Sequence, residues 1–416
     1  MSSRHAKISR ENAILTAEIG EPRITERQLA WGRELREMCE HDLLAFNVEC
    51  FPNSSGLKPC GPMQIDSIAH DQQVIENGGR VCKALFRGGC KTTMTCNAAL
   101  WATLYGKRRM APVFSQNLTK SKAQIIARWR AELLTNEALY CMFPYLVWPF
   151  RALENKYQRC ASQTFNGELT HIEWKAEKIV FPTIEGELGS GAVLLAMPLS
   201  SCRGATHTTP DGEILRPDFA ILDDVQKDED AANPRSVDKL EELIDHGVLM
   251  LGGHSKRMSV VMNCTVREEN DLGERYLAKR GWRRVRYKML ESLADNEDEH
   301  WFGPYADLLT TFDPESEQDE NRARLDALAY YQEHREAMDV GAVASWEWAY
   351  EWDDEPQTEI SAIQHAYNIR IVLGESVFAC ECQNEPLKEA ESVRILPIDD
   401  ICEKWSITEA PFKIRT

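Results

Sequence analysis

The spacing of apolar residues divides the chain into a helical beginning and a long alternating middle. Residues 1–50 carry apolar side chains three and four positions apart, as in RQLAWGRELREMCEHDLLAFNVECF, a pattern that predicts amphipathic helices. A loop rich in Pro, Gly and Ser follows at 52–62 and predicts a break. From there to about residue 290, short β-rich runs alternate with helical patterns. This alternation predicts an α/β fold with a mainly parallel sheet flanked by helices.

The individual runs define the expected elements and segments. Strands are predicted at residues 81–86, 110–114, 192–197, 219–222, 258–263 and 282–289, and half of a hairpin at 171–182. Helices are predicted at 92–105, 119–134, 233–250 and 319–338. The expected segments are an N-terminal helical appendage at 1–60, a core at 61–290, an acidic lid or linker at 291–385 and a tail at 386–416.

Charge is concentrated in one segment. Residues 291–360 hold 21 acidic residues and 3 arginines, a balance of −18 that equals the net charge of the whole chain. The rest of the chain is therefore neutral overall, and the acidity does not argue against a nucleic-acid partner for the core. The 13 cysteines include no CxxC pair, and no signal-peptide core or long apolar run is present. We expect an intracellular protein with no membrane partner.

The stretch ALFRGGCKTT, residues 84–93, lies between a predicted strand and a predicted helix. In such a loop, backbone N–H groups wrap phosphate oxygens, a lysine reaches the β- and γ-phosphates, and a hydroxyl binds Mg²⁺. Lys91 and Thr92 occupy the last two positions, whereas Leu85 and Cys90 stand where the standard pattern has glycine. A cysteine keeps its N–H, so the change matters only where φ is positive or Cβ meets the ligand. The remaining candidate nucleotide-binding residues are Gly88, Gly89, Cys90 and Thr93.

Two further strands end in polar residues. RPDFAILDD is an apolar run that ends in Asp223 and Asp224, and acids at a strand end can hold Mg²⁺ and orient an attacking water. MSVVMNCT ends in Thr265, which could lie beside the γ-phosphate. Each pattern alone also fits an ordinary turn. Together they favour a nucleoside triphosphatase.

Five segments in the same order resemble motifs of the large terminase subunits of tailed bacteriophages, ATPases that pump DNA into procapsids. FRGGCKTT resembles the Arg-bearing phosphate loop of that family, and RPDFAILDD resembles its Walker B block. MPLSSCRGATHTTPDGEILRPD resembles the segment before that block. VMNCTVREENDLGE resembles the coupling motif, and SVFACECQNEP resembles the sequence that ends the ATPase part. The resemblance covers roughly residues 40–390.

The resemblance implies a P-loop NTPase of the additional-strand (ASCE, RecA-like) type that uses ATP and Mg²⁺. It implies double-stranded phage DNA, the portal of the procapsid and the small terminase subunit as partners, a homo-oligomeric ring, and the cytoplasm of a host bacterium as the location. The family joins its ATPase to a C-terminal nuclease. Only about 30 residues follow QNEP here, so we expect no DNA cleavage by this chain.

The resemblance also implies roles for single residues. Lys91 and Thr92 would bind phosphate and Mg²⁺, and Arg87 would stabilise the transition state. Mg²⁺ would be held by Asp223. The other implied roles are orientation of water by Asp224, coupling of hydrolysis to motion by Thr265, and contact with adenine by Gln64.

One run of basic residues could contact DNA. In KRGWRRVRYK, residues 279–288, a strand would place Arg284, Arg286 and Lys288 on one face, where they could touch DNA phosphates. A solvated edge strand is the simpler interpretation.

The alternative function is a nucleotide-independent assembly module with a degenerate loop that binds the portal or the small terminase subunit. A superfamily 2 helicase is a weaker rival, since no DEAH-type segment is present.

Overall fold

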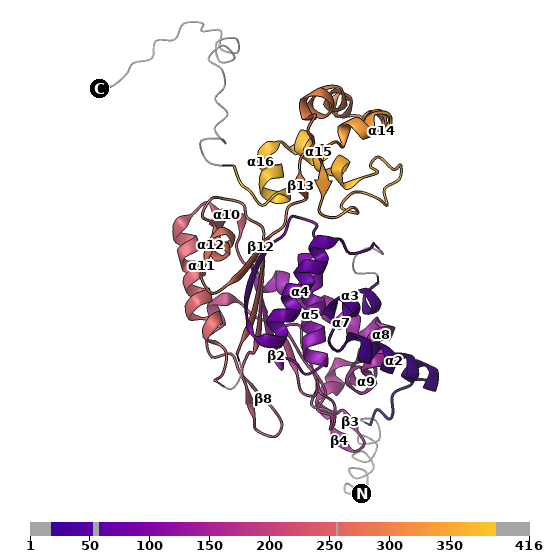
Figure 1. The fold of residues 1–416 in the computed structure, drawn as a ribbon. Helices are drawn as coiled ribbons and strands as arrows, with labels where there is room; N and C mark the ends of the chain where they lie inside the picture. Colours follow the sequence, from indigo (N-terminus) through magenta and orange to yellow (C-terminus); the bar gives the residue numbers. More distant parts are fainter. Residues whose placement is uncertain (1–17, 53–57, 255–256, 388–416) are drawn as a thin grey trace, which may run out of the picture.

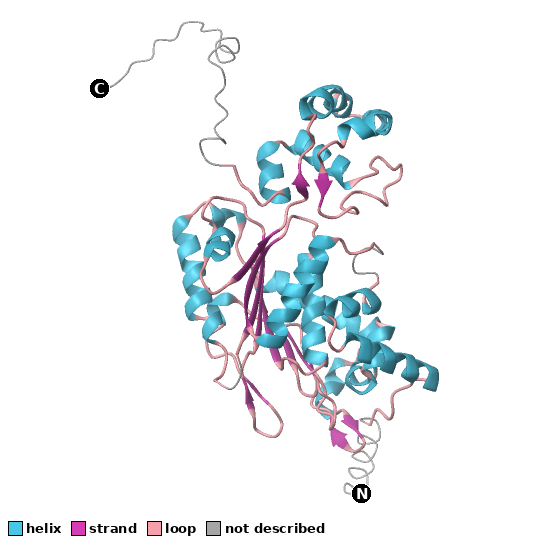
Figure 2. Ribbon diagram, viewed as in Figure 1, coloured by secondary structure: helices cyan, strands magenta, loops and turns pink. Residues whose placement is uncertain are grey.

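The computed structural model describes residues 18–52, 58–254 and 257–387, and an eight-stranded sheet forms its centre (Figures 1 and 2). The order of strands is β12 (Arg283–Arg286), β1 (Gly79–Ala84), β11 (Ser259–Cys264), β10 (Phe219–Asp223), β2 (Met110–Phe114), β7 (Val193–Ala196), β6 (Lys178–Val180) and β5 (Glu173–Trp174). Strands β12 to β7 run parallel, and β6 and β5 form an antiparallel hairpin at one edge. The predicted α/β fold with a mainly parallel sheet is confirmed.

Helices cover both faces of this sheet (Figure 1). One face carries α2 (Glu26–Cys39), α3 (Leu43–Cys50), α4 (Pro62–Asn77), α5 (Lys91–Leu104), α6 (Leu118–Lys120), the π-helical η1 (Ser121–Ile126), α7 (Ala127–Thr135), α8 (Glu137–Met142) and α9 (Pro144–Arg151). The opposite face carries α10 (Asp228–Ala231), α11 (Pro234–His246) and α12 (Leu272–Ala278). Short elements outside these layers are η2 (Tyr157–Ser162), η3 (Leu199–Ser201), η4 (Val248–Met250) and the strand pairs β3 (Thr164–Phe165) with β4 (Glu168–Leu169) and β8 (His207–Thr208) with β9 (Ile214–Leu215).

The central strands are apolar on both sides because both sides are covered. In β10, Phe219 and Ile221 belong to the core cluster under α4 and α5, whereas Ala220 and Leu222 belong to the cluster under α11 and α12. Successive side chains of a strand point to opposite faces, so a strand buried on both faces has a continuous apolar sequence. This explains why β2 and β10 begin where the sequence predicts.

The helices before residue 61 share the core of the sheet domain. Thr25 caps α2 and Asp42 caps α3, each by accepting a backbone N–H of the first turn. The Trp101 indole N–H on α5 donates to the Cys39 carbonyl at 2.8 Å, and the Tyr105 hydroxyl donates to the Arg36 carbonyl at 2.7 Å. These buried bonds fix α2 against α5.

Two predicted elements end earlier than expected. The helix predicted at 233–250 stops at His246, and η4 follows after Gly247. The strand predicted at 282–289 leaves the sheet after Arg286. There the Met289 N–H donates to the Cys382 carbonyl at 2.8 Å, so the chain turns away from β1 to pair with a distant segment.

The acidic segment, residues 291–385, forms a smaller subdomain beyond the carboxyl edge of the sheet (orange and yellow in Figure 1). A cluster of stacked aromatic side chains forms its core, with Trp301 and Tyr367 parallel at 4.1 Å between ring centroids. The predicted helix at 319–338 is confirmed as α14. No helix within the described ranges has the length and apolar character needed to cross a bilayer. The elements of the acidic subdomain are β13 (Leu290–Ser292), η5 (Glu297–Tyr305), α13 (Ala306–Thr310), α14 (Glu317–Met338), β14 (Val343–Ala344), α15 (Ala362–Leu373), α16 (Glu375–Val377) and η6 (Phe378–Cys382).

Candidate functional site

The predicted chemical groups meet because three parallel strands end together. In the register of the sheet, Asp223 of β10 pairs with Asn263 of β11, and Ala84 of β1 pairs with Cys264. The carboxyl ends of parallel strands lie at one edge, so the segments after β1, β10 and β11 leave the sheet side by side. The end of β1 thereby meets the ends of β10 and β11, which lie 139 and 180 residues later in the sequence.

Thr92 and Asp223 face each other at this edge. The Thr92 hydroxyl donates to Asp223 Oδ2 at 2.9 Å, and Asn263 Nδ2 donates to Asp223 Oδ1 at 3.2 Å. Asn263 Nδ2 also donates to Thr95 Oγ1 at 2.8 Å, which ties β11 to α5. Hydroxyl and carboxylate oxygens are ligands that Mg²⁺ prefers, directly or through water. The two residues predicted to hold the metal are therefore adjacent and suitable in type.

Burial controls the protonation of Asp223. Asp223 is only 3% exposed. Burial is the main reason that the pKa of its carboxyl lies above the ordinary value. The neighbouring Asp224 raises the pKa further, whereas the hydrogen bonds from Thr92 and Asn263 and the charge of Lys91 oppose the rise. A bound divalent cation would reverse this balance, because a metal charge favours the carboxylate.

Lys91 is the first residue of α5 and points across the strand ends. Its ammonium donates to Thr265 Oγ1 in a short hydrogen bond and lies 3.7 Å from Asp224 Oδ1. The Asp224 backbone has a φ of 50°, and its N–H donates to the Asn263 carbonyl at 3.1 Å. The left-handed turn directs the Asp224 side chain away from the sheet. Lys91, Thr265 and Asp224 thus form one polar cluster.

The loop before α5 contains two residues with left-handed backbone. Gly88 has a φ of 87° with open space around its Cα, and Cys90, the residue that precedes α5, has a φ of 62° and a ψ of 19°. Cys90 therefore occupies the backbone region where glycine is favoured and a side chain costs free energy. Cysteine at this position therefore carries a cost in conformational free energy that glycine would not.

The N–H groups of this loop are partly occupied. The Arg87 N–H donates to the Glu381 carbonyl at 2.8 Å, and the Gly89 N–H donates to the Phe86 carbonyl at 3.1 Å. The first N–H groups of α5 have no partner within the helix, because a helix start leaves its first donors unsatisfied. An anion at this helix start would meet the N–H groups of Lys91 and Thr92 and the positive end of the helix dipole.

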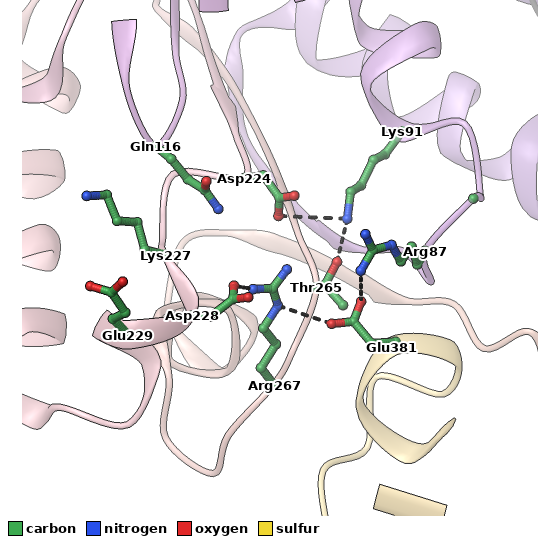
Figure 3. A pocket seen from close by; sticks show the side chains of 11 residues that line it. Arg87, Lys91, Gln116, Asp224, Lys227, Asp228, Glu229, Thr265, Arg267 and Glu381 are labelled. Atoms are coloured by element: carbon green, nitrogen blue, oxygen red, sulfur yellow. Dashed lines mark hydrogen bonds and ion pairs between the residues drawn. The ribbon is translucent and has the colours of Figure 1, made fainter. Parts of the chain in front are cut away.

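A cavity of about 460 Å³, here called the Lys91 cavity, opens above the cluster (Figure 3). Four cationic and four acidic side chains share it with Thr265, so the walls are strongly polar. Figure 3 shows Lys91 and Arg87 on one side and Arg267 on the other. The lining residues are Arg87, Gly88, Lys91, Gln116, Asp224, Lys227, Asp228, Glu229, Thr265, Arg267 and Glu381.

Glu381 links the acidic subdomain to both arginines of this cavity. One carboxylate oxygen lies 3.7 Å from Arg87 and the other lies 3.6 Å from Arg267. Arg87 is mostly in water, with 78% of its side chain exposed, and Arg267 also contacts Asp228. Sequence reasoning predicted Arg87 but missed Arg267 and Glu381. Glu381 lies within SVFACECQNEP, one of the five segments that resemble terminase motifs.

Gln64 lies in a second cavity on the other side of the loop, here called the Gln64 cavity. It has a volume of about 350 Å³, and Cys90 and Thr93 also line it. Gln64 is buried, its Oε1 accepts the Gly61 N–H at 2.9 Å, and its Nε2 has no hydrogen-bond partner among the described residues. Asn97 also lines this cavity, and its buried Oδ1 likewise has no partner in the described chain. Most of the predicted nucleotide-binding and catalytic residues therefore line one of two cavities beside the same loop, whereas Thr92 and Asp223 line neither.

The three basic residues predicted to touch DNA lie on and just after the edge strand β12. Arg284 donates to the Leu277 carbonyl at 3.2 Å, and Arg286 donates to the Asn384 carbonyl at 2.7 Å. Lys288 lies 2.7 Å from Glu385. Arg286 and Lys288 thus have structural roles at the junction with the acidic subdomain, and Arg284 contacts α12. Contact with DNA remains a prediction.

No protein-family model matches the chain, and no curated protein sequence matches it significantly. The function must therefore be inferred from the geometry of the site.

Proposed function

We propose that the chain is an ATP-hydrolysing motor domain of the terminase large-subunit type, built on a P-loop NTPase core of the additional-strand class. One observation carries this proposal. Lys91, Thr92, Asp223, Asp224 and Thr265, taken from three separate motifs, converge at the carboxyl edge of one parallel sheet. A phosphate-binding lysine, a metal-binding hydroxyl and carboxylate, and a second acid beside them are the groups that phosphoryl transfer to water requires.

In this proposal the nucleotide spans the two cavities. The triphosphate lies over the start of α5, with the N–H groups of Lys91 and Thr92 and the Lys91 ammonium around it. Thr92 and Asp223 would hold Mg²⁺, which would neutralise charge on the phosphates when bound. Adenine enters the Gln64 cavity, where the unpartnered amide of Gln64 supports binding of a base with hydrogen-bonding edges.

Hydrolysis would use groups that already line the Lys91 cavity. Asp224 orients the attacking water, and Lys91 stabilises the negative charge on the transferred phosphoryl group. Thr265 contacts Lys91 directly, so a change at the phosphate is passed to the end of β11 and to the loop that follows it. Arg87 must leave Glu381 to reach a phosphate, since the two form an ion pair across the cavity wall.

The motor role rests on the family resemblance described above. We propose that the substrate of translocation is double-stranded phage DNA, that a ring of copies acts on the portal of a procapsid, and that the small terminase subunit delivers the DNA. The host cytoplasm is the proposed location, and ATP and Mg²⁺ are the proposed cofactors.

DNA-stimulated ATP hydrolysis tests this function. Wild type should hydrolyse ATP faster with double-stranded DNA and portal present. Lys91→Ala and Asp223→Ala should each lose at least about 10²-fold in kcat, as expected when a preorganised charge at the reacting phosphate is removed. Lys239→Ala, at an exposed position of α11, is the matched control and should retain wild-type activity. Normal hydrolysis by Lys91→Ala would refute the assignment.

The second candidate function is a nucleotide-independent assembly module. The observation that favours it is the state of the loop, in which the N–H groups of Arg87 and Gly89 are already donated to carbonyl groups. A module of this kind would bind the portal or the small terminase subunit equally well with and without MgATP. A pull-down with purified portal, with and without MgATP, separates the two hypotheses. The motor predicts that MgATP changes the amount of portal bound, whereas the assembly module predicts no change.

A further inference from the structure

The Lys91 cavity contains two arginines, Arg87 and Arg267. The proposed function gives a role to Arg87 only. Arg267 lies two residues after Thr265, in the segment between β11 and α12. Arg267 and Lys91 both line the Lys91 cavity, and Figure 3 shows the Arg267 guanidinium beside Asp228. A group bound in the cavity against Lys91 and Thr265 would therefore share that cavity with Arg267.

The backbone at Arg267 is fixed from three directions. The Arg267 N–H donates to Asp271 Oδ2 at 2.9 Å, and the Cys380 thiol donates to the Arg267 carbonyl at 3.2 Å. The preceding N–H, of Val266, donates to Asn384 Oδ1 at 2.9 Å. Asp271 and Asn384 are both buried. The base of the side chain is thus held by the core and by the acidic subdomain together.

The guanidinium is held between two carboxylates. It contacts Asp228, just after the β10 segment, and its Nε lies 3.6 Å from Glu381 Oε1. Only 21% of the Arg267 side chain is exposed, compared with 78% for Arg87. A partly dehydrated guanidinium presents a planar set of donors that matches phosphate as well as carboxylate oxygens. Arg267 also loses less conformational freedom on binding than Arg87, because it is already confined.

We propose that Arg267 is a phosphate-contacting residue that exchanges its contact with Glu381 or Asp228 for the terminal phosphate of a bound nucleoside triphosphate. This inference rests on the proposed function, since it requires a nucleotide in the Lys91 cavity. It adds Arg267 to Lys91 and Arg87, the two residues proposed or implied above to stabilise charge at the transferred phosphate. Because Glu381 contacts both arginines, the terminal phosphate would also draw Arg267 away from the acidic subdomain.

Two ligands distinguish contact with the terminal phosphate from a purely structural role. The affinities of MgADP and of MgADP with aluminium fluoride, which mimics the transferred phosphoryl group, are measured by calorimetry for wild type and Arg267→Ala. We expect Arg267→Ala to bind MgADP as wild type does and to bind the aluminium fluoride complex at least about 10-fold more weakly, a loss of roughly 1.4 kcal/mol. Its kcat should fall by about 10²-fold or more.

Two variants control for folding and for charge. Arg275→Ala removes an arginine of similar exposure on α12 that pairs with Asp238 and Glu241 outside the cavity, and it should keep the wild-type ratio of the two affinities. Arg267→Lys keeps the charge but not the fork of donors, and it should recover part of the lost affinity. It also serves in place of Arg267→Ala should that variant fail to fold.

The outcomes separate the two hypotheses. Equal weakening of both ligands in Arg267→Ala, or no change in either, would overturn the role of Arg267 and leave the proposed function standing. Failure of wild type to bind MgADP would reject the proposed function and this inference with it.

Discussion

Cys90 shows how one residue can carry a conformational cost in the loop before α5. Its φ of 62° is a region in which a side chain costs about 1 kcal/mol, and glycine removes this cost while adding chain entropy to the unfolded state. We therefore expect Cys90→Gly to have a higher free energy of unfolding than Cys90→Ala, which keeps the strain and loses the thiol. Urea denaturation of the two variants measures the difference, and a less stable glycine variant would contradict it.

We expect the Asp223 carboxylate to lower the stability of the folded protein while it provides a ligand for the metal. Burial raises the pKa of its carboxyl in the folded state, so between the unfolded and folded pKa values the folded protein binds more protons. Stability therefore falls as pH rises through that window, and at neutral pH the buried carboxylate is destabilising. Asp223→Asn should raise the Tm of the nucleotide-free protein at pH 7 and abolish Mg²⁺-dependent nucleotide binding.

The pH dependence provides the control for Asp223→Asn. Below about pH 3.9, the ordinary pKa of an aspartate, the side chain is protonated in both folded and unfolded states. The difference in Tm between wild type and Asp223→Asn should therefore shrink as pH falls towards that value. A difference that stays constant with pH would mean that the gain in Tm comes from packing.

At the scale of elements, a buried ion pair joins α4 to β1. Lys83 of β1 lies 2.6 Å from Asp71 of α4 and donates to the Ser67 hydroxyl at 3.1 Å, and both charged side chains are fully buried. This pair holds the helix that carries Gln64 against the strand that leads into the Lys91 loop. Its position makes it part of the support of both cavities.

Breaking this pair should cost far more than replacing it. Asp71→Ala leaves the Lys83 ammonium buried without its partner, and we expect a loss of about 3–5 kcal/mol in the free energy of unfolding. The double variant Lys83→Met with Asp71→Leu removes both charges and should be markedly more stable than Asp71→Ala. Chemical denaturation measures both. A double variant as unstable as the single one would contradict the argument.

The elements that the sequence predicted well are those buried on both faces. Apolar runs gave both bounds of β2 and the start of β10, and local turn chemistry gave the start of α5 to within one residue. Predictions failed where a distant segment decides the path. β12 ends at Arg286 because the next residues pair with η6 and β14, which no local pattern at 282–289 reveals.

The same reason explains which site residues the sequence revealed. Lys91, Thr92 and Asp223 lie in motifs with their own spacing, and their meeting follows from the rule that parallel strands end at one edge. Arg267 and Glu381 face each other only after the acidic subdomain docks on the sheet domain. Arg267 lies in VMNCTVREENDLGE and Glu381 in SVFACECQNEP, but neither segment shows by itself that the two side chains meet, so only the folded structure places them in one cavity.

At the scale of the whole molecule, the acidic subdomain closes over the Gln64 cavity. Trp346, which lines that cavity, donates its indole N–H to the Pro59 carbonyl at 2.9 Å. Next to it, the Lys58 ammonium lies 3.9 Å from the ring of Trp348 and 4.0 Å from the ring of Trp352. A base that enters this cavity would therefore contact both parts of the molecule at once.

Tryptophan fluorescence should report this contact. We expect MgATP to change the emission of wild type and expect most of that change to be lost in Trp346→Phe, which keeps an aromatic ring without the indole. Trp31→Phe, an exposed tryptophan on α2, is the matched control and should preserve the change. An unchanged signal in Trp346→Phe would show that the base does not enter the Gln64 cavity.

The central claim is that the Lys91 loop and the Thr92–Asp223 pair bind a nucleotide together with Mg²⁺. The most direct measurement is calorimetry of a non-hydrolysable ATP analogue against wild type, Lys91→Ala and Thr92→Ala, with Mg²⁺ and with chelator. The account predicts Mg²⁺-dependent binding to wild type, loss of binding in Lys91→Ala, and binding without Mg²⁺ dependence in Thr92→Ala. Absence of Mg²⁺-dependent binding to wild type, or wild-type affinity in Lys91→Ala, would contradict it.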